Sequence, residues 1–297
     1  MELREITTFI HVAQLKSFSK AAKHLGYSQA AVTIQIKQLE DELGVHLFDR
    51  IGKQTTLTHH GSVFYEYASS ILQNIEQAKD ALSEPELLSG RLCIGTIESI
   101  CASIFPKLLR EFHRRYPGVS ISIETDSPDV LLERMNRNAI DIVYFLDKRI
   151  YDPKWIKVLE APEEIVFVAH RDNPIAAYQH LELNQLLSQP FILTEKNASY
   201  RLMLDQYLTQ QNRHINPFLE SSSTDFIIDM LHHNMGVSFL PYFTVQDDIK
   251  KGRLHALKVE AFHMRSWRQV VYHKDKWISR EMRAFLNLVY EMESGIK

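Results

Sequence analysis

Cysteine is scarce in this sequence, whose 297 residues include only Cys93 and Cys101. Their spacing matches neither a CxxC motif nor the paired spacing of a zinc finger, so we expect no disulfide framework and no structural zinc. The histidine pairs at 59–60 and 232–233 are adjacent, whereas two ligands on one helix face lie four residues apart. We therefore expect no metal and no cofactor. A redox role for Cys101 stays open, because a thiol at a helix N-terminus has a lowered pKa.

Long apolar runs are absent as well. No stretch approaches the roughly twenty apolar residues of a membrane span. Glu2, Arg4 and Glu5 interrupt the start, where a signal peptide has a basic and then an apolar segment. We therefore expect a soluble, cytoplasmic protein with no membrane partner. Hydrophobic residues make up 45% of the chain, which is enough for two or three packed domains.

The sequence also lacks the common motifs of catalytic sites. It contains no GxGxxG, phosphate-loop, GxSxG or HExxH pattern, which would indicate nucleotide binding, acyl transfer or metal-assisted hydrolysis. We therefore expect no catalytic residues. The alternative is an enzyme joined to a further domain, and substrate turnover would distinguish it.

Positive charge is not in excess, since the formal net charge is -3. Its distribution is nevertheless uneven. Between Ile6 and Leu39 the chain has four lysines and no carboxylate, namely Lys16, Lys20, Lys23 and Lys37. Affinity for phosphate depends on where cations gather rather than on their sum. We therefore expect a phosphate-binding face near the N-terminus.

The N-terminal segment predicts a helix, a tight turn and a helix. Apolar residues at helical spacing indicate a first amphipathic helix, with Leu3, Ile6, Phe9, Ile10 and Ala13 on its buried face. Ser19 is predicted to cap a short second helix that stops at Gly26. Ser28 is predicted to cap a third helix, which ends at Gly44.

The third helix has one apolar and one polar face. Its predicted core stripe is Val32, Ile36, Leu39 and Leu43. The candidate DNA contacts lie at its start and on the opposite face, namely Ser28, Gln29, Ala30, Thr33, Ile34 and Lys37. This composition suits a major groove, where amides read adenine, methyl groups meet thymine and lysine holds phosphate. Ile34 is apolar on this face, and either a thymine methyl or another protein chain would explain it.

A short hairpin is predicted at 46–58, with its turn at Gly52 and Lys53. It would form a wing beside the third helix. Arg50 and Lys53 are candidates to reach the minor groove or the DNA backbone. Residues 1–58 thus predict a winged helix-turn-helix domain that binds double-stranded DNA.

The run FIHVAQLKSFSKAAKHLGYSQAAVTIQIKQLEDELGVHLFDR at 9–50, followed by LTHHG, resembles the LysR-type transcriptional regulators. The later segments RLCIGT, FHRRYPGVSISI, PFILTE and GVSFLP resemble the effector domain of the same family. The resemblance implies that Gln29, Thr33 and Lys37 contact DNA and that Arg50 is a wing contact. The sequence departs at Ile34, where many relatives carry a basic residue, so operator preference does not follow from the resemblance.

Residues 59–90 predict a long helix and a hinge. Its apolar residues follow a 4-3-4-3-4 spacing, namely Phe64, Ala68, Ile71, Ile75, Ala78 and Leu82. This a/d seam is typical of two helices that wrap around each other, which predicts a dimer and an inverted-repeat operator. The alternative is a helix that packs on its own domain. Glu84, Pro85 and Gly90 are expected to form the hinge.

Residues 91–297 predict alternating strands and helices around a mostly parallel sheet. A single helix is expected at 99–116, and strands are expected at 92–96, 119–124, 140–145, 165–169, 191–194, 218–220, 237–240 and 269–272. We expect lobe I at about 91–161 and 268–297, and lobe II at about 162–267. The family resemblance implies the same two-lobed α/β, periplasmic-binding-protein-like effector domain. The whole chain is thus an α+β multidomain protein.

Ligands of open α/β sheets bind beyond the carboxyl ends of strands, where helices begin. The candidate effector residues at these places are Thr96, Glu98, Ser99, Ser127, Thr194, Ser222 and Thr224. Hydroxyls and helix N-termini suit a small carboxylate, whereas Glu98 would repel a carboxylate and pair with an amine. An amino-acid-like effector satisfies both observations. The alternative is that these side chains only cap helices.

The leading hypothesis is a regulator whose DNA binding a small molecule controls. The resemblance further implies a homotetramer, built as a dimer of dimers, and recruitment of RNA polymerase. An architectural DNA-binding protein is the alternative, and dependence of operator affinity on a small molecule would distinguish the two. The sequence leaves open whether the output is activation or repression.

Overall fold

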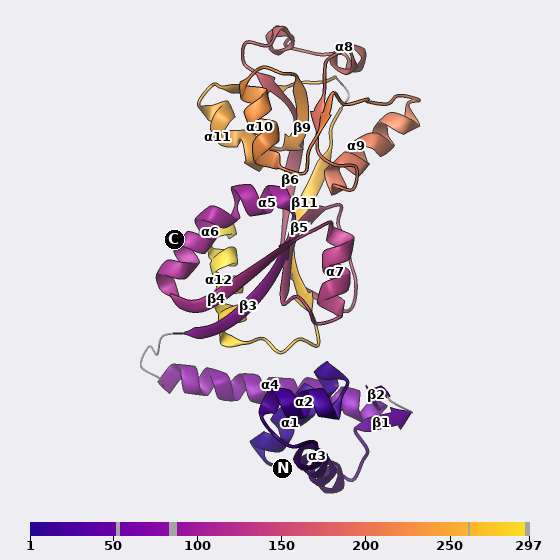
Figure 1. Ribbon diagram of the computed structural model, residues 1–297, viewed down its shortest axis with the longest axis vertical. Coiled ribbons are helices and arrows are strands. Elements are labelled where there is room, and N and C mark those ends of the chain that lie inside the picture. Colours follow the sequence, from indigo (N-terminus) through magenta and orange to yellow (C-terminus); the bar gives the residue numbers. More distant parts are fainter. Residues whose placement is uncertain (52–53, 83–87, 261, 295–297) are drawn as a thin grey trace. The chain divides into compact units, whose positions relative to one another are not determined.

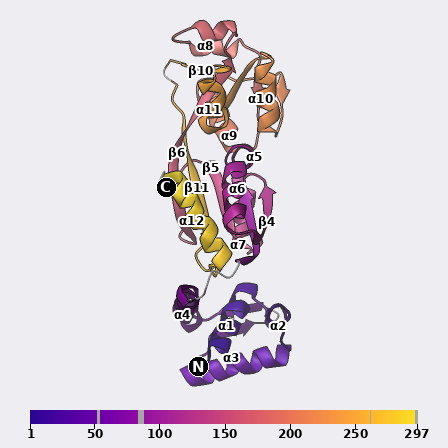
Figure 2. The same ribbon diagram turned by 90° about the vertical axis from the view of Figure 1, so that its left-hand side faces the viewer.

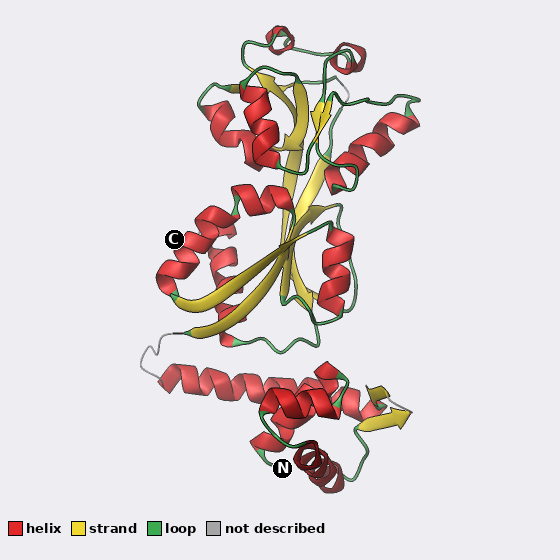
Figure 3. Cartoon of the chain, viewed as in Figure 1, coloured by secondary structure: helices red, strands yellow, loops and turns green. Residues whose placement is uncertain are grey.

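The computed structural model describes residues 1–51, 54–82, 88–260 and 262–294. Its contacts divide the chain into two compact units, Met1–Glu86 with Asp275–Ser279, and Leu87–Lys274 with Arg280–Lys297. Figure 3 shows that helices dominate the first unit, whereas the second combines helices with long strands. Among the described residues, no helix is both long enough and apolar enough to cross a bilayer.

Three helices build the core of the first unit, and Figure 2 shows α3 from the side, below α1 and α2. Their bounds are α1 Leu3–Leu15, α2 Phe18–Leu25 and α3 Gln29–Leu43. Ser17 caps α2 in place of the predicted Ser19, because its hydroxyl accepts the Lys20 N–H at 3.3 Å. The helix begins earlier than predicted, with Phe18 buried at its first position. Gly26 ends α2 at a φ of 72°, as predicted.

A two-stranded hairpin follows, with β1 at Phe48–Ile51 and β2 at Gln54–Leu57. It corresponds to the predicted wing, although the turn at 52–53 lies outside the described residues. The carboxylate of Glu40 on α3 anchors the hairpin by accepting the N–H groups of Leu47 and Phe48, at 2.7 and 3.2 Å. The wing is therefore fixed to α3 by charge-assisted hydrogen bonds.

The long helix α4 His59–Leu82 completes the first unit. Gly61 in its first turn lies against the wing, where a Cβ would collide with the Leu47 carbonyl oxygen. This contact explains why glycine is required in the LTHHG segment.

Part of the predicted α4 seam packs on its own domain, which was the alternative to a dimer contact. Ala68 is fully buried, and Phe64 and Ile71 pack against the helix-turn-helix core. The rings of Phe64 and Phe9 on α1 lie 5.0 Å apart. Sequence spacing did not reveal this partner because α1 lies far away along the chain. The side chains of the last two seam residues, Ala78 and Leu82, lie outside the described part.

The second unit contains two lobes, shown in Figure 1, and lobe I comprises 88–164, 265–274 and 280–294. Its parallel strands are β3 Ser89–Thr96, β4 Gly118–Thr125 and β5 Ile142–Asp147, and β11 Arg265–His273 pairs antiparallel with β5. Helices α6 Phe105–Arg115 and α12 Arg280–Ser294 pack together on one face, and α7 Pro128–Asn136 covers the other. The Phe112 and Phe285 rings, 5.5 Å apart, join α6 to α12.

The long strand β6 Trp155–His170 runs from lobe I into lobe II. It pairs with β11 as far as Glu164, and with β9 and β10 from Ile165 onward. Strands β6 and β11 both run antiparallel to their neighbours, so the sheet is mixed. The expectation of a mostly parallel sheet is therefore wrong. Strands β6 and β11 connect the two lobes (Figure 1).

Lobe II comprises 165–260 and 262–264. Its elements are η1 Pro174–Ala177, α8 Leu183–Leu187, β7 Ile192–Leu193, α9 Ser199–Gln210, β8 Leu219–Glu220, α10 Thr224–His232, β9 Val237–Pro241, α11 Tyr242–Lys250 and β10 Leu254–Leu257. A core cluster joins Val168 on β6 to Ile227 and Leu231 on α10. This packing fixes the start of α10, which lies close to the candidate effector residues.

The predicted helix at 99–116 is two helices. The short α5 Glu98–Ser103 ends at Ile104, and α6 begins at Phe105. Pro106 in the first turn of α6 has no backbone N–H, so it cannot continue the hydrogen bonding of α5. The break gives α5 its own direction at the start of lobe I.

Candidate functional site

Helix α3 presents a capped and well-supported recognition surface. The Ser28 hydroxyl accepts the Ala31 N–H at 3.1 Å, which confirms the predicted cap. Val32, Ile36 and Leu39 are fully buried. Leu43 is 36% exposed, so the predicted stripe is wrong at its last member. Burial stops at Leu39 because Leu43 is the final residue before the Gly44 cap, at the end of the helix.

The face of α3 opposite this core is solvent-exposed. Gln29, Ala30 and Lys37 are exposed, and Ile34 is 57% exposed. Thr33 is half-buried, and its hydroxyl donates to the Gln29 carbonyl oxygen at 2.9 Å. The structure thus brings the predicted DNA contacts of α3 to one surface. Ile34 lies near its centre, because a helix turns about 100° per residue and places position 34 almost opposite the buried stripe.

The wing residues are only partly described. Arg50 lies on β1, where its backbone pairs with Thr55, but its side chain is outside the described part. Lys53 also lies outside the described residues. Their contacts with DNA therefore stay predictions. Gln38 on α3, which the sequence did not single out, is exposed near Ile34 and belongs to the same surface.

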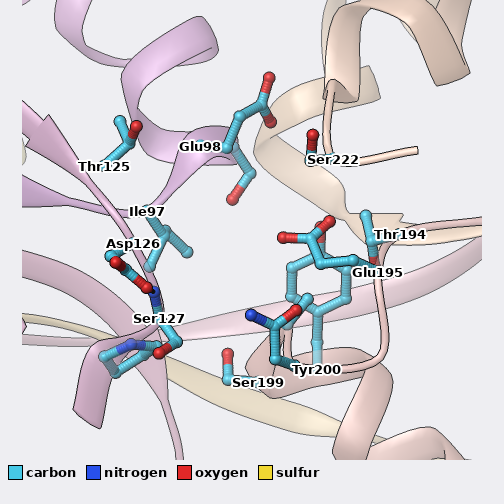
Figure 4. A pocket seen from close by; sticks show the side chains of 14 residues that line it. Ile97, Glu98, Thr125, Asp126, Ser127, Thr194, Glu195, Ser199, Tyr200 and Ser222 are labelled. Atoms are coloured by element: carbon cyan, nitrogen blue, oxygen red, sulfur yellow. Dashed lines mark hydrogen bonds between the residues drawn. The ribbon is translucent and has the colours of Figure 1, made fainter. Parts of the chain in front are cut away.

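A cavity of about 340 Å³ lies between the two lobes of the second unit. Its walls come from the starts of α5, α7 and α9 and from the loop between β8 and α10. The lining residues are Ile97, Glu98, Ser99, Thr125, Asp126, Ser127, Pro128, Thr194, Glu195, Asn197, Ala198, Ser199, Tyr200 and Ser222. Figure 4 shows Asp126 and Ser127 on one side of this space and Thr194 and Glu195 on the other.

Five of the seven predicted effector residues line this cavity, namely Glu98, Ser99, Ser127, Thr194 and Ser222. Thr96 and Thr224 do not, which corrects the prediction for both. Thr96 is fully buried, and its hydroxyl donates to the Tyr144 carbonyl oxygen at 2.8 Å. Thr224 is buried in a contact with Glu98. The hydroxyls of the lining therefore differ from the predicted set, because Thr125, Ser199 and Tyr200 also line the cavity.

Sequence reasoning missed two of the three acidic residues of the cavity and its amide residue. Asp126 directly precedes Ser127, and Glu195 directly follows Thr194. Their position beyond the ends of β4 and β7 was the signal that could have found them. Asn197 and Ser199, at the start of α9, follow the same rule.

Three hydrogen bonds connect the lobes beside the cavity. The Glu98 carboxylate of α5 accepts the Thr224 N–H at 2.9 Å and also the Thr224 hydroxyl. On α9, the Ser199 hydroxyl donates to the carbonyl oxygen of Leu146 on β5. Glu98 therefore satisfies a free N–H at the start of α10, although the side-chain cap of that helix is Ser223. Its sequence-predicted ligand role competes with this structural role.

Burial shifts the pKa values of titratable groups at and near the cavity. Burial raises the pKa of the Glu98 carboxyl, the Thr224 hydrogen bonds lower it, and the Asp225 and Glu195 carboxylates raise it further. Burial also raises the pKa of the Cys101 thiol, with a smaller contribution from Glu98. The expectation of a lowered Cys101 pKa is therefore wrong, because burial and a neighbouring carboxylate both disfavour its thiolate.

In the described part of the chain, the remaining thiol and imidazole groups form no evident redox or metal centre. Burial and the nearby Glu124 carboxylate raise the pKa of the Cys93 thiol, and both cysteines are free. The rings of His59 and His60 lie 5.9 Å apart. Among residues 1–51, 54–82, 88–260 and 262–294, no group of three or more His, Cys, Asp or Glu side chains is arranged to hold a metal.

Comparison with known protein families matches both units. Residues 3–62 match the model of the bacterial regulatory helix-turn-helix protein, lysR family. Residues 85–293 match the model of the LysR substrate binding domain. The second match alone spans more than half of the chain.

Individual relatives agree over nearly the whole length. An uncharacterized HTH-type transcriptional regulator, YwqM of Bacillus subtilis, is 35% identical over 97% of this chain and 98% of its own. The HTH-type transcriptional activator CmpR of Synechocystis is 28% identical over 99% of this chain and 96% of its own. These relatives are transcriptional regulators and not enzymes.

Solved structures show the same fold. A full-length OxyR variant from Pseudomonas aeruginosa matches with a TM-score of 0.57 and 22% identity, over 97% of this chain and 94% of that one. Vibrio fischeri DarR in complex with DNA matches with a TM-score of 0.52 and 19% identity, over 98% of both chains. With both family models matched in order along one chain, this protein belongs to the LysR family of transcriptional regulators.

Proposed function

We propose that the chain is a sequence-specific regulator whose promoter binding is controlled by a small effector bound in the cavity between the lobes. LysR-type regulators bind promoter DNA and small molecules and form oligomers. The observation that carries the proposal is the pairing, in one chain, of an exposed recognition face on α3 with a polar cavity between two lobes. An architectural protein would need only the first of these features.

The α3 face would enter the major groove. The Gln29 amide suits an adenine edge, the Thr33 methyl suits thymine, and Lys37 suits a phosphate. Arg50 and Lys53 on the wing would add contacts to the backbone or the minor groove. Two copies of α3 about 34 Å apart would read an inverted repeat.

Formation of a dimer would set the distance between those two copies of α3. Of the predicted seam, Phe64, Ala68 and Ile71 are used within the chain, so a partner helix would need other residues of α4 as well. Val63 and Tyr67 lie one turn apart on α4, and Tyr67 is 68% exposed. An exposed apolar pair at i and i+4 is typical of a helix surface that contacts a second chain. A tetramer of two such dimers, and contact with RNA polymerase, complete the proposal.

The effector would act on the contacts between the lobes. Glu98 and Ser199 line the cavity and also bridge the lobes. A ligand that hydrogen-bonds either side chain would favour one arrangement of the lobes over another. In an oligomer this preference would change the spacing of the DNA-binding domains, which would couple effector and operator affinities reciprocally. Since promoters are its target, the protein would work in the cytoplasm.

The effector would be a small carboxylate or an amino-acid-like compound. Helices α7 and α9 begin at the cavity, and their free N–H groups suit a carboxylate. The acidic side chains on the walls suit an amine. An amino-acid-like compound offers both groups and fits a space of about 340 Å³.

Genome-wide mapping of the sites bound by the protein would test the function. Expected are discrete sites with an inverted repeat, whose neighbouring genes indicate candidate effectors. Operator affinity should then change with one of these compounds. Gln29→Ala should reduce discrimination by about 1–3 kcal/mol, whereas Gln210→Ala, an exposed glutamine on α9, should not change it. The proposal would be contradicted if Gln29→Ala left site selection unchanged, or if no candidate compound changed the operator affinity.

A further inference from the structure

The cavity between the lobes is lined by one sign of charge. Three of its lining residues are carboxylic acids, Glu98, Asp126 and Glu195, and none is lysine, arginine or histidine. Lys196 lies in the same loop as Glu195 but is exposed and does not line the cavity. The remaining polar lining consists of hydroxyls and one amide. A ligand inside therefore meets negative charge from both lobes.

The adjacent arginine does not offset this charge. Arg201, on the first turn of α9, is buried and is not among the residues that line the cavity. It donates to the Thr194 carbonyl oxygen at 2.9 Å and to the Asp205 carboxylate at 3.0 Å. It also lies 3.5 Å from the Glu220 carboxylate. The Arg201 guanidinium is thus occupied by these partners, and its hydrogen bond to Thr194 stabilises the loop that contains Thr194 and Glu195.

The three acids differ in how their oxygens are satisfied. Glu98 accepts two hydrogen bonds from Thr224, and Asp126 accepts the Ser127 N–H at 2.7 Å. One carboxylate oxygen of Glu195, Oε2, is buried and has no hydrogen-bond partner among the described residues. A buried carboxylate oxygen without a donor is costly, so this atom requires a partner that the protein itself does not supply.

A second unpartnered group faces the same space. The Ser99 residue is only 2% exposed, lines the cavity, and its hydroxyl has no hydrogen-bond partner within the described part of the chain. A hydroxyl can donate to or accept from a ligand. An acidic acceptor and a buried hydroxyl, both unsatisfied, mark two fixed points at which a bound molecule would complete the hydrogen bonding.

We propose that the effector carries a cationic group, a protonated amine or a guanidinium, whose N–H groups donate to Glu195, with Ser99 completing its polar contacts. Asp126, on the opposite side of the cavity in Figure 4, adds a second negative charge that disfavours simple carboxylate ligands. The ligand class is thus a small organic amine or a basic amino acid. This inference rests on the proposed function, since it takes the cavity as the effector site.

The sign of the charge preference can be measured without knowing the effector. Ser222→Cys places a thiol on the cavity wall, in a Cys93→Ala and Cys101→Ala background of the full-length protein. Its labelling rate is compared for trimethylammonium-ethyl and sulfonato-ethyl methanethiosulfonate, which differ in charge and are similar in size. The cationic reagent should react roughly tenfold faster, relative to its rate with a free thiol. Equal rates, or a faster anionic reagent, overturn the proposal.

Matched variants assign the preference to Glu195. Glu195→Gln should reduce the rate ratio several-fold, whereas Glu260→Gln, the same change at an exposed residue of lobe II outside the cavity, should leave it unchanged. Ser127→Cys provides a second thiol position, and circular dichroism verifies folding of each variant. A ratio that Glu195→Gln does not change at either position refutes the role of this residue.

The same labelled protein tests the proposed function separately. A covalent label on the thiol that Ser222→Cys introduces occupies the cavity. It should therefore change operator affinity by threefold or more if the cavity controls DNA binding. A label that leaves operator affinity unchanged contradicts the proposed function. A change in operator affinity together with an absent charge preference retains the proposed function and overturns only the cationic class.

Discussion

The recognition helix and the effector cavity are built in opposite ways. On α3, Gln29, Thr33 and Lys37 share one surface because they follow the periodicity of a single helix. In the cavity, Glu98 comes from the start of α5, and Asp126 and Glu195 come from two loops elsewhere in the sequence. A local periodicity determines the first site, whereas a tertiary fold determines the second. The two regions should therefore respond differently to substitution and to pH.

The largest expected effect tests whether each region depends on its own core. Phe9 is fully buried among the rings of Phe48 and Phe64, so Phe9→Ala should cost about 3–5 kcal/mol of unfolding free energy. Hydrogen exchange with mass spectrometry should show this loss in the first unit. Phe112→Ala, a matched change in lobe I, should act on the second. Equal loss of protection in both units from either variant would remove the distinction.

Acid should sharpen the comparison, because the two regions bury groups of opposite charge type. Burial and, to a smaller extent, the neighbouring His24 together lower the pKa of the His11 imidazole to about 4. Unfolded His11 binds a proton near pH 6.5, so its contribution to stability is present above that pH and is lost as the pH falls toward 4. After allowance for partial exposure, the loss is about 2 kcal/mol for the first unit.

The second unit should lose less on acidification. Burial raises the pKa values of the Glu98 and Glu163 carboxyls, although Thr224 and Arg268 respectively oppose the shift. For an acid with a raised pKa, stability is greatest below its ordinary pKa and is lost as the pH rises through the folded value. Acidification from pH 7 to pH 5 should therefore reduce the stability of the first unit selectively, and unfolding measured at both pH values would show this. His11→Gln should abolish that selectivity and His60→Gln, at an exposed position, should not.

The next effect separates a helix-capping role of Glu98 from a purely ligand-binding role. Glu98→Ala removes the acceptor of the Thr224 N–H at the start of α10, and should cost about 1–2 kcal/mol in the second unit. Glu98→Gln retains an acceptor oxygen and should stay within about 0.5 kcal/mol. Thermal unfolding without any effector measures both. If Glu98→Ala is neutral, Glu98 does not support the fold and belongs to ligand binding alone.

The sequence predicted most of the first unit because its signals are local. Ser28 and Gly44 mark the ends of α3, and the exposed face follows from its buried stripe. The errors are also local in origin. Ser17 and Ser19 both qualify as caps, and only the burial of Phe18 decides between them. The contact of α4 with its own domain could not be predicted, because it depends on how α1 and α4 meet in space.

In the second unit, the sequence identified the loops of the cavity but not which side chains enter it. Thr96 ends β3 and Ser99 follows it, yet the Thr96 hydroxyl is used within the fold and Ser99 lines the cavity. The strand β6 was predicted only at 165–169, since its first part contains Pro162 and several charged residues. Pairing with β11, more than a hundred residues later, establishes the rest of that strand. Such long-range pairing leaves little periodic signal in the sequence.

The smallest expected effect tests the one apolar residue at the centre of the recognition face. Ile34 is 57% exposed, almost opposite the buried stripe of α3, where a thymine methyl would remove its side chain from water. One methyl group buried is worth about 0.8 kcal/mol, or about fourfold in operator affinity. An operator with uracil in place of the contacted thymine should lose this factor with the natural protein. With Ile34→Ala the two operators should bind equally, whereas Ala30→Gly should preserve the difference. If uracil substitution anywhere in the operator has no effect, Ile34 does not read DNA, and its exposed side chain is available to another protein chain.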